Sequence, residues 1–578
     1  MGELRGGRGI VPDGRVRNAF RAIDAVASAG KAIPVGRGRR IGVMPAAIAA
    51  IGVALVASPK AEARSHSHAV PAWAKAAIEQ AQATLPPSVF FDGGQIPSFL
   101  PQTETDLDET GVIENYLPND PNGFTTTGNA FFTAAGITAN GRACITCHQP
   151  PTGWSVTPAN IQDRFIATNG TDPIFDPVDG MDCPDEAATA TTIAGKVAAS
   201  SLLLNKGLFR IFLPIPTVQN CTPGAFKTCT NGAPAQFTVQ VLNDPYGCEN
   251  SSTYGVNAAT PIISVYRRPL PSTNLRFVTN AVGNIMWDGR EPTLESQASD
   301  ATQIHGQAPT PPTTAEIDQM VEFEGGDPTL PGGGVFTAQS LDDIAGDLTS
   351  YDGATGGPVP LVTDPTGVKG DPGSPDNTVF EMYEPWSLLT ATDPVDAQRE
   401  AIAAGENIFN NFEFTISGVA GLNDVSRKAE PNGGPLTTGT CSECHNQTYS
   451  GSDTAKGAEH NIGLTGDHPD AAAPTPDLPL FALTCTSGQY ETAAGIEQVT
   501  TPTTFITDDP GVATISGLCF DIGKTKVPVL RGLASRAPYF HNAFAPSLLD
   551  VVNFYDTRFS IGFTDEQKID LVSFLETL

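Results

Sequence analysis

Three observations in the sequence predict a mainly α-helical fold built from two similar halves. The pattern Cys-x-x-Cys-His occurs twice, at residues 144–148 and 441–445. Before the second copy, residues 397–412 carry apolar side chains at helical spacings of three and four, namely Ala401, Ala404, Ile408 and Phe409. A last amphipathic pattern, with Thr564 or Ser560 as its cap, closes the chain at residues 564–578. We therefore expect one helical domain around each Cys-x-x-Cys-His copy.

Each Cys-x-x-Cys-His copy is typical of the covalent attachment of a c-type haem. Its two thiols form thioethers to the porphyrin, and the adjacent imidazole is aimed at the iron. The residues are Cys144, Cys147 and His148 in the first copy and Cys441, Cys444 and His445 in the second. A zinc pair or a redox dithiol is the alternative for a single copy. Two copies, each ending in His, favour two covalently bound haem c groups in two cytochrome c-like haem domains.

The first 63 residues have the order of a secretory signal. Arg37, Arg39 and Arg40 precede a nearly uncharged run at 41–58, and the small-residue signature at 61–63 follows it. We expect residues 1–63 to be a cleavable leader, so that the mature protein is periplasmic or secreted and has no stable membrane insertion. Because Met44 lies within the run, translation starts either at Met1 or at Met44.

Charge separates the leader from the rest of the chain. Residues 1–63 hold 10 Lys/Arg and 4 Asp/Glu, which leaves 23 basic and 59 acidic residues and a net charge of −36. Such a surface excludes nucleic acid as a partner, because the phosphate backbone requires positive charge. It would attract a small basic cytochrome or another basic redox protein as electron donor.

The cysteines and turn residues outline two inserts. Six cysteines remain beside the haem pairs, and in an oxidising compartment we expect disulfides. Cys485 and Cys519 are expected to pair with each other, whereas three pairings stay open for Cys183, Cys221, Cys229 and Cys248. We predict a disulfide-tied insert at about 176–265 with minor β-structure at 237–241, and a loop-rich insert at about 309–376.

These features divide the chain into three parts: the leader at 1–63, a first haem domain with both inserts at 64–390, and a second haem domain at 391–578. Short helices are further expected at 128–141, leading into the first Cys-x-x-Cys-His copy, and at 314–323, interrupting the second insert.

Two further motifs carry a resemblance to a known family. Residues 285–290 read Ile-Met-Trp-Asp-Gly-Arg, and residues 537–542 read Ala-Pro-Tyr-Phe-His-Asn after Lys526-Val-Pro-Val-Leu-Arg. Together with the two Cys-x-x-Cys-His copies, and in the same order, they resemble the bacterial di-haem cytochrome c peroxidase and MauG superfamily. The resemblance covers roughly 125–160, 265–308, 395–465 and 524–578. It does not extend to the inserts.

The resemblance implies roles for particular residues. Trp287 matches the tryptophan that passes electrons between the haems, and His541 lies in the motif that follows the second haem. Asn274 and the carbonyls of Arg536 and Pro538 match the ligands of an inter-haem calcium ion. A core aromatic entering a turn is the alternative for Trp287, and Asn274 has many structural explanations.

The sixth iron ligands are expected to differ between the haems. No methionine follows His445, and the position where family peroxidases carry Met falls on Tyr555, which resembles the arrangement in MauG. An anionic phenolate stabilises ferric iron more than a thioether does. The alternative is that Tyr555 is an aromatic packed on the haem.

At the first haem, the family's loop glutamate is missing, because no glutamate lies between Glu295 and Glu316. His305 or Gln307 is the candidate to take over proton transfer during peroxide cleavage. Alternatively, His305 ligates the first iron in the resting state or is an ordinary loop residue.

The sequence therefore predicts an exported di-haem oxidoreductase of the peroxidase or MauG type, with hydrogen peroxide or oxygen as its small-molecule oxidant. The alternatives are a di-haem dioxygenase acting on an organic substrate, as in the related rubber oxygenases, and a non-enzymatic electron carrier.

Overall fold

The computed structural model describes most of the chain beyond residue 102. The described residues are 103–107, 111–117, 128–215, 217–220, 230–275, 278, 285–325, 334–341, 379–380, 382–419, 422–423, 435–447, 450–453, 459–465, 475, 477–492 and 495–578. The predicted leader, Met44 included, lies outside them, as do Cys221 and Cys229 and most of the second insert. Among the described residues, no helix is long and apolar enough to cross a membrane.

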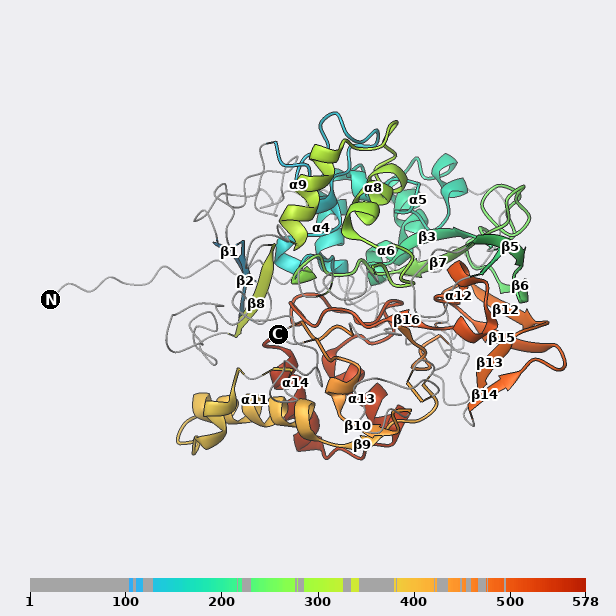
Figure 1. The fold of residues 1–578 in the computed structure, drawn as a ribbon. Helices are drawn as coiled ribbons and strands as arrows, with labels where there is room; N and C mark the ends of the chain where they lie inside the picture. Colours follow the sequence, from blue (N-terminus) through green and yellow to red (C-terminus); the bar gives the residue numbers. More distant parts are fainter. Residues whose placement is uncertain are drawn as a thin grey trace, which may run out of the picture.

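In Figure 1 the segment with the first Cys-x-x-Cys-His copy forms the upper half of the molecule, and the segment with the second copy forms the lower half. The upper half contains α4 (Pro158–Thr168), α5 (Ile193–Ala199), α6 (Ser201–Lys206), α8 (Leu294–Ile304) and α9 (Thr314–Gly325). The lower half contains α11 (Pro394–Asn411), α12 (Ala513–Ser516), α13 (Leu548–Phe559) and α14 (Asp565–Leu575). The helix predicted at 314–323 is confirmed by α9.

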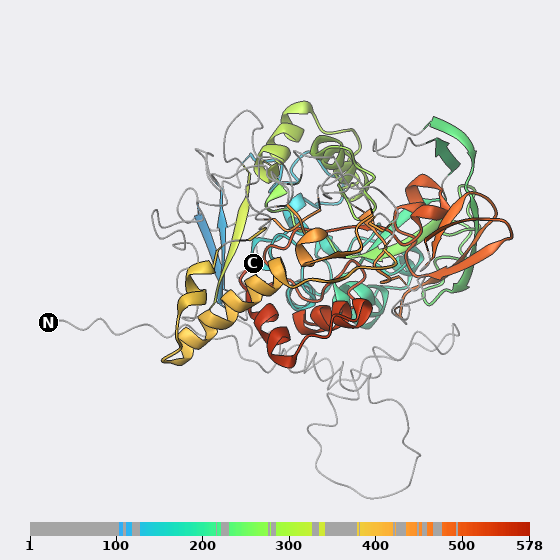
Figure 2. The same ribbon diagram turned by 60° about the horizontal axis from the view of Figure 1, so that its bottom comes forward.

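Helices α11 and α14 confirm the two longer predictions and pack side by side (Figure 2). Thr564 caps α14, since its hydroxyl accepts a hydrogen bond from the N–H of Gln567 at 3.2 Å. Gly405 allows the close approach of α11, because a Cβ at this position would lie 2.0 Å from the carbonyl oxygen of Asp570. Phe409 and Phe574 pack between the two helices with their rings tilted, and the ring centroids are 5.7 Å apart.

The prediction of a helix at 128–141 is wrong. These residues form turns instead. Gly128, Gly136 and Gly141 have φ angles of 81°, 78° and 79°, which lie in the left-handed region and cannot continue a right-handed helix. The pairs of Phe and Ala that suggested a helix still enter the core, since Phe131 and Phe132 are fully buried.

Short strands are more widespread than the sequence indicated, and the described residues form seven small sheets. The first includes β1 (Thr103–Leu107), β2 (Gly111–Tyr116) and β8 (Phe336–Leu341), so the second insert contains a strand as well as loop. Others pair β3 (Phe209–Pro214) with β7 (Ile262–Arg267), β4 (Thr217–Asn220) with β5 (Thr230–Pro234), β9 (Phe414–Thr415) with β10 (Thr438–Gly439), β11 (Glu459–His460) with β16 (Thr525–Lys526), and β13 (Gln489–Thr492) with β14 (Gly495–Gln498).

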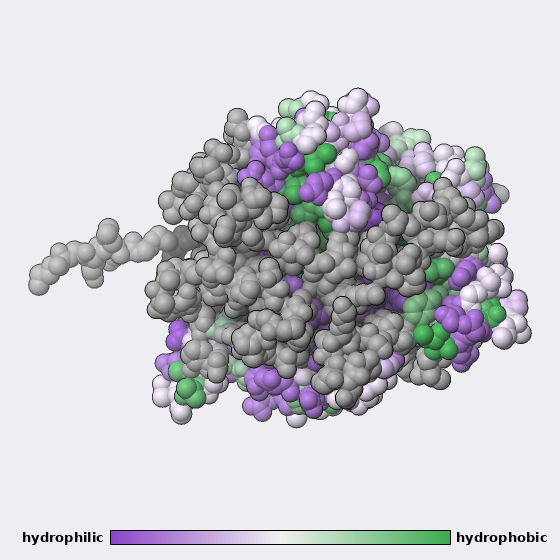
Figure 3. All heavy atoms as spheres, in the orientation of Figure 1, coloured by the Kyte–Doolittle hydropathy of each residue, from purple (hydrophilic) through white to green (hydrophobic). Residues whose placement is uncertain are grey.

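One sheet joins the two halves of the chain. Strand β6 (Phe237–Asn243), which confirms the strand predicted in the first insert, pairs with β12 (Leu480–Cys485), and β12 pairs with β15 (Thr503–Thr507). Green β6 lies beside orange β12 in Figure 1, and hydrophobic residues show over this region at the right edge of Figure 3. The predicted disulfide Cys485–Cys519 is present, and Cys183 pairs with Cys248.

A buried ion-pair cluster also connects the halves. Arg267, at the end of β7, makes two hydrogen bonds of 2.6 and 2.8 Å to the carboxylate of Asp509 and one of 2.6 Å to Asp288. Arg290 donates a further bond to Asp288 at 2.8 Å. Burial alone would raise the pKa of Asp509, but the guanidinium of Arg267 outweighs it and holds that pKa below its usual value.

We predict that Arg267→Met lowers the free energy of unfolding by about 3–5 kcal/mol, because the carboxylates of Asp288 and Asp509 stay buried after their partner is lost. Denaturant unfolding followed by circular dichroism measures the change. The matched control is Lys206→Met, which removes a half-exposed ion pair with Asp477 and should cost less than about 1 kcal/mol. The difference in unfolding free energy between the parent and Arg267→Met should shrink as the pH falls through the folded-state pKa of Asp509. A carboxylate whose pKa is lowered by folding stabilises the folded state only while it is ionised. Equal effects of both substitutions would contradict the assigned role of Arg267.

Candidate functional site

The first Cys-x-x-Cys-His copy forms one tight helical turn on the wall of a cavity. Residues Cys144–Thr146 are a 3-10 turn, and the N–H of His148 donates to the carbonyl of Cys144 at 3.0 Å. The two sulfurs and the imidazole therefore face the same space. Nδ1 of His148 lies 3.0 Å from the carbonyl oxygen of Trp154 and 3.0 Å from Oγ of Ser272. These contacts occupy Nδ1 and leave Nε2 as the nitrogen able to bind a metal.

The electrostatics of this turn favour neutral ligands. Burial lowers the pKa of His148 to about 4, so its imidazole is uncharged at neutral pH. Burial raises the pKa of the Cys147 thiol to about 12 and that of Cys144 still further. Without a bound cation, both thiols are therefore protonated at neutral pH. None of the four motif cysteines forms a disulfide among the described residues.

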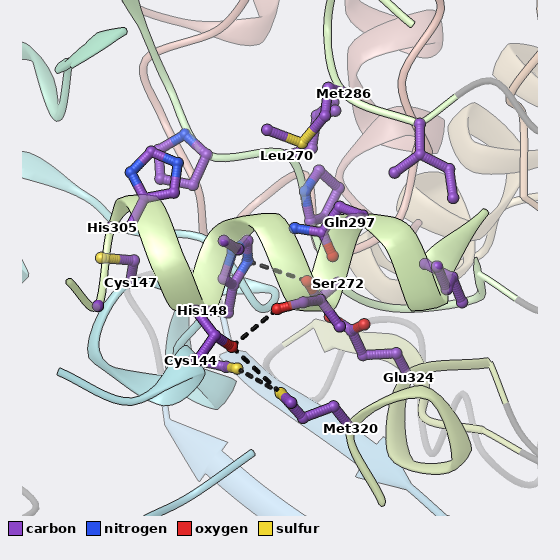
Figure 4. Close-up of a pocket in the computed structure, with 18 of the residues that line it drawn as sticks. Cys144, Cys147, His148, Leu270, Ser272, Met286, Gln297, His305, Met320 and Glu324 are labelled. Carbon is purple, nitrogen blue, oxygen red and sulfur yellow. Dashed lines mark hydrogen bonds between the residues drawn. The ribbon is translucent and has the colours of Figure 1, made fainter. Parts of the chain in front are cut away.

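Across the first cavity lies the end of helix α8. Figure 4 shows His305 and Gln297 coming from this helix toward the same pocket as His148. Nδ1 of His305 lies 2.5 Å from the carboxylate of Asp179, a residue of the first insert. Arg142 also pairs with Asp179. Burial alone would raise the pKa of Asp179, but Arg142 and His305 together lower it, so this carboxylate stays charged.

Gln307, the other candidate for proton transfer, lies elsewhere. Its side chain is exposed, its φ of 52° follows the turn after α8, and it is not among the residues that line the first cavity. Gln297, which lies within α8 ten residues earlier, lines the cavity instead. The structure therefore brings His305 toward His148, and it does not do so for Gln307.

The second Cys-x-x-Cys-His copy repeats the arrangement. Residues Cys441–Glu443 form a 3-10 turn, and Nδ1 of His445 lies 2.7 Å from the carbonyl oxygen of Gly451. Burial lowers the pKa of His445 to about 4. The two cavities are similar in size, with about 1580 and 1460 Å³ free of atoms when the open mouths are included. Each cavity is lined mostly by apolar side chains, which is typical of sites that enclose a large organic ligand.

Tyr555 lies on α13 and lines the second cavity. Its ring packs on Phe540 and Phe559, with centroid distances of 6.1 and 6.3 Å. Burial, with a smaller contribution from Cys444 and Cys441, raises the pKa of Tyr555 well above its usual value. The phenol is therefore neutral unless a positive charge is placed beside it.

Four residues line both cavities: Arg268, Pro269, Trp287 and Lys526. We call them the partition. Nε1 of Trp287 donates to the carbonyl of Arg268 at 2.7 Å, and the N–H of Lys526 donates to the carbonyl of Trp287 at 2.8 Å. The Trp287 ring is 9% exposed and thus almost fully enclosed. The structure therefore places Trp287 between the two Cys-x-x-Cys-His turns, as the resemblance implied.

Two further histidines line the second cavity. Nε2 of His460 lies 2.7 Å from Asp453, and its Nδ1 has no hydrogen-bond partner among the described residues. His541 is 1% exposed and its ring lies 5.8 Å from that of Trp287. Its ring nitrogens make no hydrogen bond in the described chain, although Nε2 is 3.6 Å from Asp509. Burial lowers the pKa of His541 to about 4.

Two of the three residues expected to bind calcium, Arg536 and Asn274, already use their oxygens in hydrogen bonds. The carbonyl of Arg536 accepts a hydrogen bond of 2.9 Å from the guanidinium of Arg268, and this positive charge would repel a cation. The side-chain oxygen of Asn274 already accepts from Thr273 and Thr337, at 2.9 and 3.2 Å. Calcium takes six to eight oxygen ligands, and these hydrogen bonds engage the oxygens of two of the residues expected to supply them. We leave calcium out of the function proposed below.

Comparisons with known proteins do not identify a family. Neither a scan against protein-family models nor a search of curated proteins gave a match.

Sequence reasoning missed several residues of these cavities. Asp179 carries no local signal, because it lies in the irregular insert and meets His305 only through the fold. Lys526 stood inside a quoted motif without a role, and Gln297 lies seven residues after the motif at 285–290. His460 could have been suspected, since it is one of few histidines and follows the second haem pattern by fifteen residues.

Proposed function

We propose that this protein is an exported di-haem oxidoreductase of the peroxidase or MauG type, with one haem c in each cavity. The observation that carries the proposal is the partition: one buried tryptophan borders two cavities, and each cavity has a complete Cys-x-x-Cys-His turn on its wall. An apolar space, two neutral thiols and a neutral imidazole with an occupied Nδ1 are the features that covalent haem needs. Export by the leader at 1–63 provides the compartment in which such haem proteins mature.

When bound, haem supplies the electron transfer and the peroxide or oxygen chemistry. His148 and His445 would hold the two irons through Nε2. The carboxylate of Asp179 orients His305, which leaves the other nitrogen of its ring to move a proton within the first cavity. Met286, Gln297 and the apolar side chains around them restrict water on that side.

Trp287 lines both cavities and would pass electrons between them, and Tyr555 lines the second cavity, where it would meet the haem. Ferric iron beside Tyr555 would stabilise a phenolate against the effect of burial, so ligation is compatible with the raised pKa of the free group. The acidic surface favours a small basic cytochrome as the electron donor.

We predict that protein matured in a periplasm carries two haem groups, because both Cys-x-x-Cys-His turns are complete. Intact mass spectrometry should show two haem additions and loss of the leader near Ala63. Cys144→Ala with Cys147→Ala should remove one addition, and the corresponding pair at Cys441 and Cys444 should remove the other. One addition or none in the parent protein would refute the di-haem proposal.

For Trp287, we predict that Trp287→Phe keeps both haems and slows oxidation of the second haem after peroxide is added. Phenylalanine fills much of the space but is much harder to oxidise and lacks Nε1. Stopped-flow absorbance measures the rate. The control is Trp386→Phe, since Trp386 stacks on Tyr383 away from both cavities. Unchanged kinetics in the Trp287 variant would reduce this residue to a packing role.

For Tyr555, we predict that Tyr555→Phe changes the spectrum of the second haem and raises its reduction potential, because an anionic donor to ferric iron is lost. Spectroscopic potentiometry gives both quantities. Tyr490→Phe serves as the control, because the Tyr490 hydroxyl bonds to Glu497 on an exposed strand. If both variants behave like the parent, Tyr555 packs against the porphyrin and does not ligate iron.

A further inference from the structure

Lys526 is the one lysine of the partition, and its main chain is tightly held. It lies on β16, whose partner β11 carries Glu459 and His460. Its N–H donates to the carbonyl of Trp287, and its side chain lines both cavities while only 6% of the residue is exposed. The ammonium group is therefore carried by the wall that separates the two Cys-x-x-Cys-His turns.

The ammonium group of Lys526 has no hydrogen-bond partner in the described chain. Burial lowers the pKa of Lys526 to about 8, and the nearby acids Glu459 and Asp453 offset only part of this effect. Neither acid accepts a hydrogen bond from it. A buried charge without a partner is costly, and proteins retain such groups mainly where a ligand completes them. Lys524, two residues earlier, shows the ordinary arrangement, since it pairs with Asp521 at 3.1 Å.

The partition contains a second cation, Arg268, whose charge is not neutralised either. Arg268 directs its guanidinium to the main-chain carbonyls of Lys206, Val156 and Arg536. Neutral carbonyls satisfy its hydrogen bonds but do not neutralise its charge. The wall between the cavities is thus positively charged, in a chain whose net charge is −30. An anionic ligand fits this place.

We propose that Lys526 binds a carboxylate of the porphyrin in each cavity and so couples the two haems electrostatically. This inference rests on the proposed di-haem function and assigns to Lys526 the propionate side chains of that cofactor. An ammonium group has three donors, enough for acceptors on both sides of the partition. A buried positive charge near an iron disfavours its ferric state. One side chain then raises the reduction potentials of both haems.

The test compares Lys526→Met with the parent protein, both matured in a periplasm. Methionine keeps the length and removes the charge. Intact mass first establishes that two haems are present, and their absence from the parent would refute the di-haem function itself. With both haems present, spectroscopic potentiometry should show that both reduction potentials fall. Resonance Raman spectra should show shifted propionate bending bands at both haems.

Matched variants separate charge from packing. Lys526→Arg keeps the charge and should leave both potentials close to those of the parent. Lys524→Met removes a nearby lysine that lines neither cavity and should also leave them unchanged. If Lys526→Met does not mature, Lys526→Gln is expected to lower both potentials in its place. A change at only one haem, or at neither, in a variant that carries both haems would overturn the proposal.

Discussion

The salt bridges of Arg267 are the interaction on which the rest of the site depends. This guanidinium is almost fully buried and binds Asp288 and Asp509, residues that lie 21 and 242 positions away in the sequence. It thereby fixes three segments against one another: the end of β7, the turn that carries Trp287, and the loop before α12. Such a pair adds little net stability over apolar packing, but it specifies geometry, since removing one partner leaves a buried charge.

Hydrogen bonds to main-chain carbonyls extend this geometry into the partition. Arg268 donates its N–H to the carbonyl of His541, Trp287 donates to Arg268, and Lys526 donates to Trp287. Each bond joins segments from different parts of the chain. The indole and the main chain of Trp287 are therefore each tied to a neighbouring residue of the partition.

The cavities combine low polarity with a small number of charged groups. Burial keeps His148, His445 and His541 neutral, and it keeps the thiols of Cys144 and Cys147 protonated. Asp179 remains charged only because Arg142 and His305 bind it. The carboxylate of Asp179 is thus compensated by charged partners, whereas the ammonium group of Lys526 has no hydrogen-bond partner in the described part of the chain and would be completed by a ligand.

The sequence alone determined whatever depends on a few neighbouring residues. The two Cys-x-x-Cys-His copies are defined by the spacing of their residues in the sequence. Helices α9, α11 and α14 follow from apolar periodicity, and α14 also from its Thr564 cap. The strand at β6 was visible in the same way. Where local pattern and backbone geometry disagreed, at 128–141, positive φ at three glycines decided against a helix.

Only the tertiary structure decided which of these pieces meet. It paired β6 with β12 across the two halves and brought Asp179 to His305 over 126 positions. It also exposed Gln307, and it turned Arg268 toward the carbonyl that calcium was expected to bind. Contacts of this kind depend on the packing of whole elements, which short windows of sequence do not encode. The position of Trp287 is the clearest case. Its motif drew attention to the residue, but only the fold placed a cavity on each side of it.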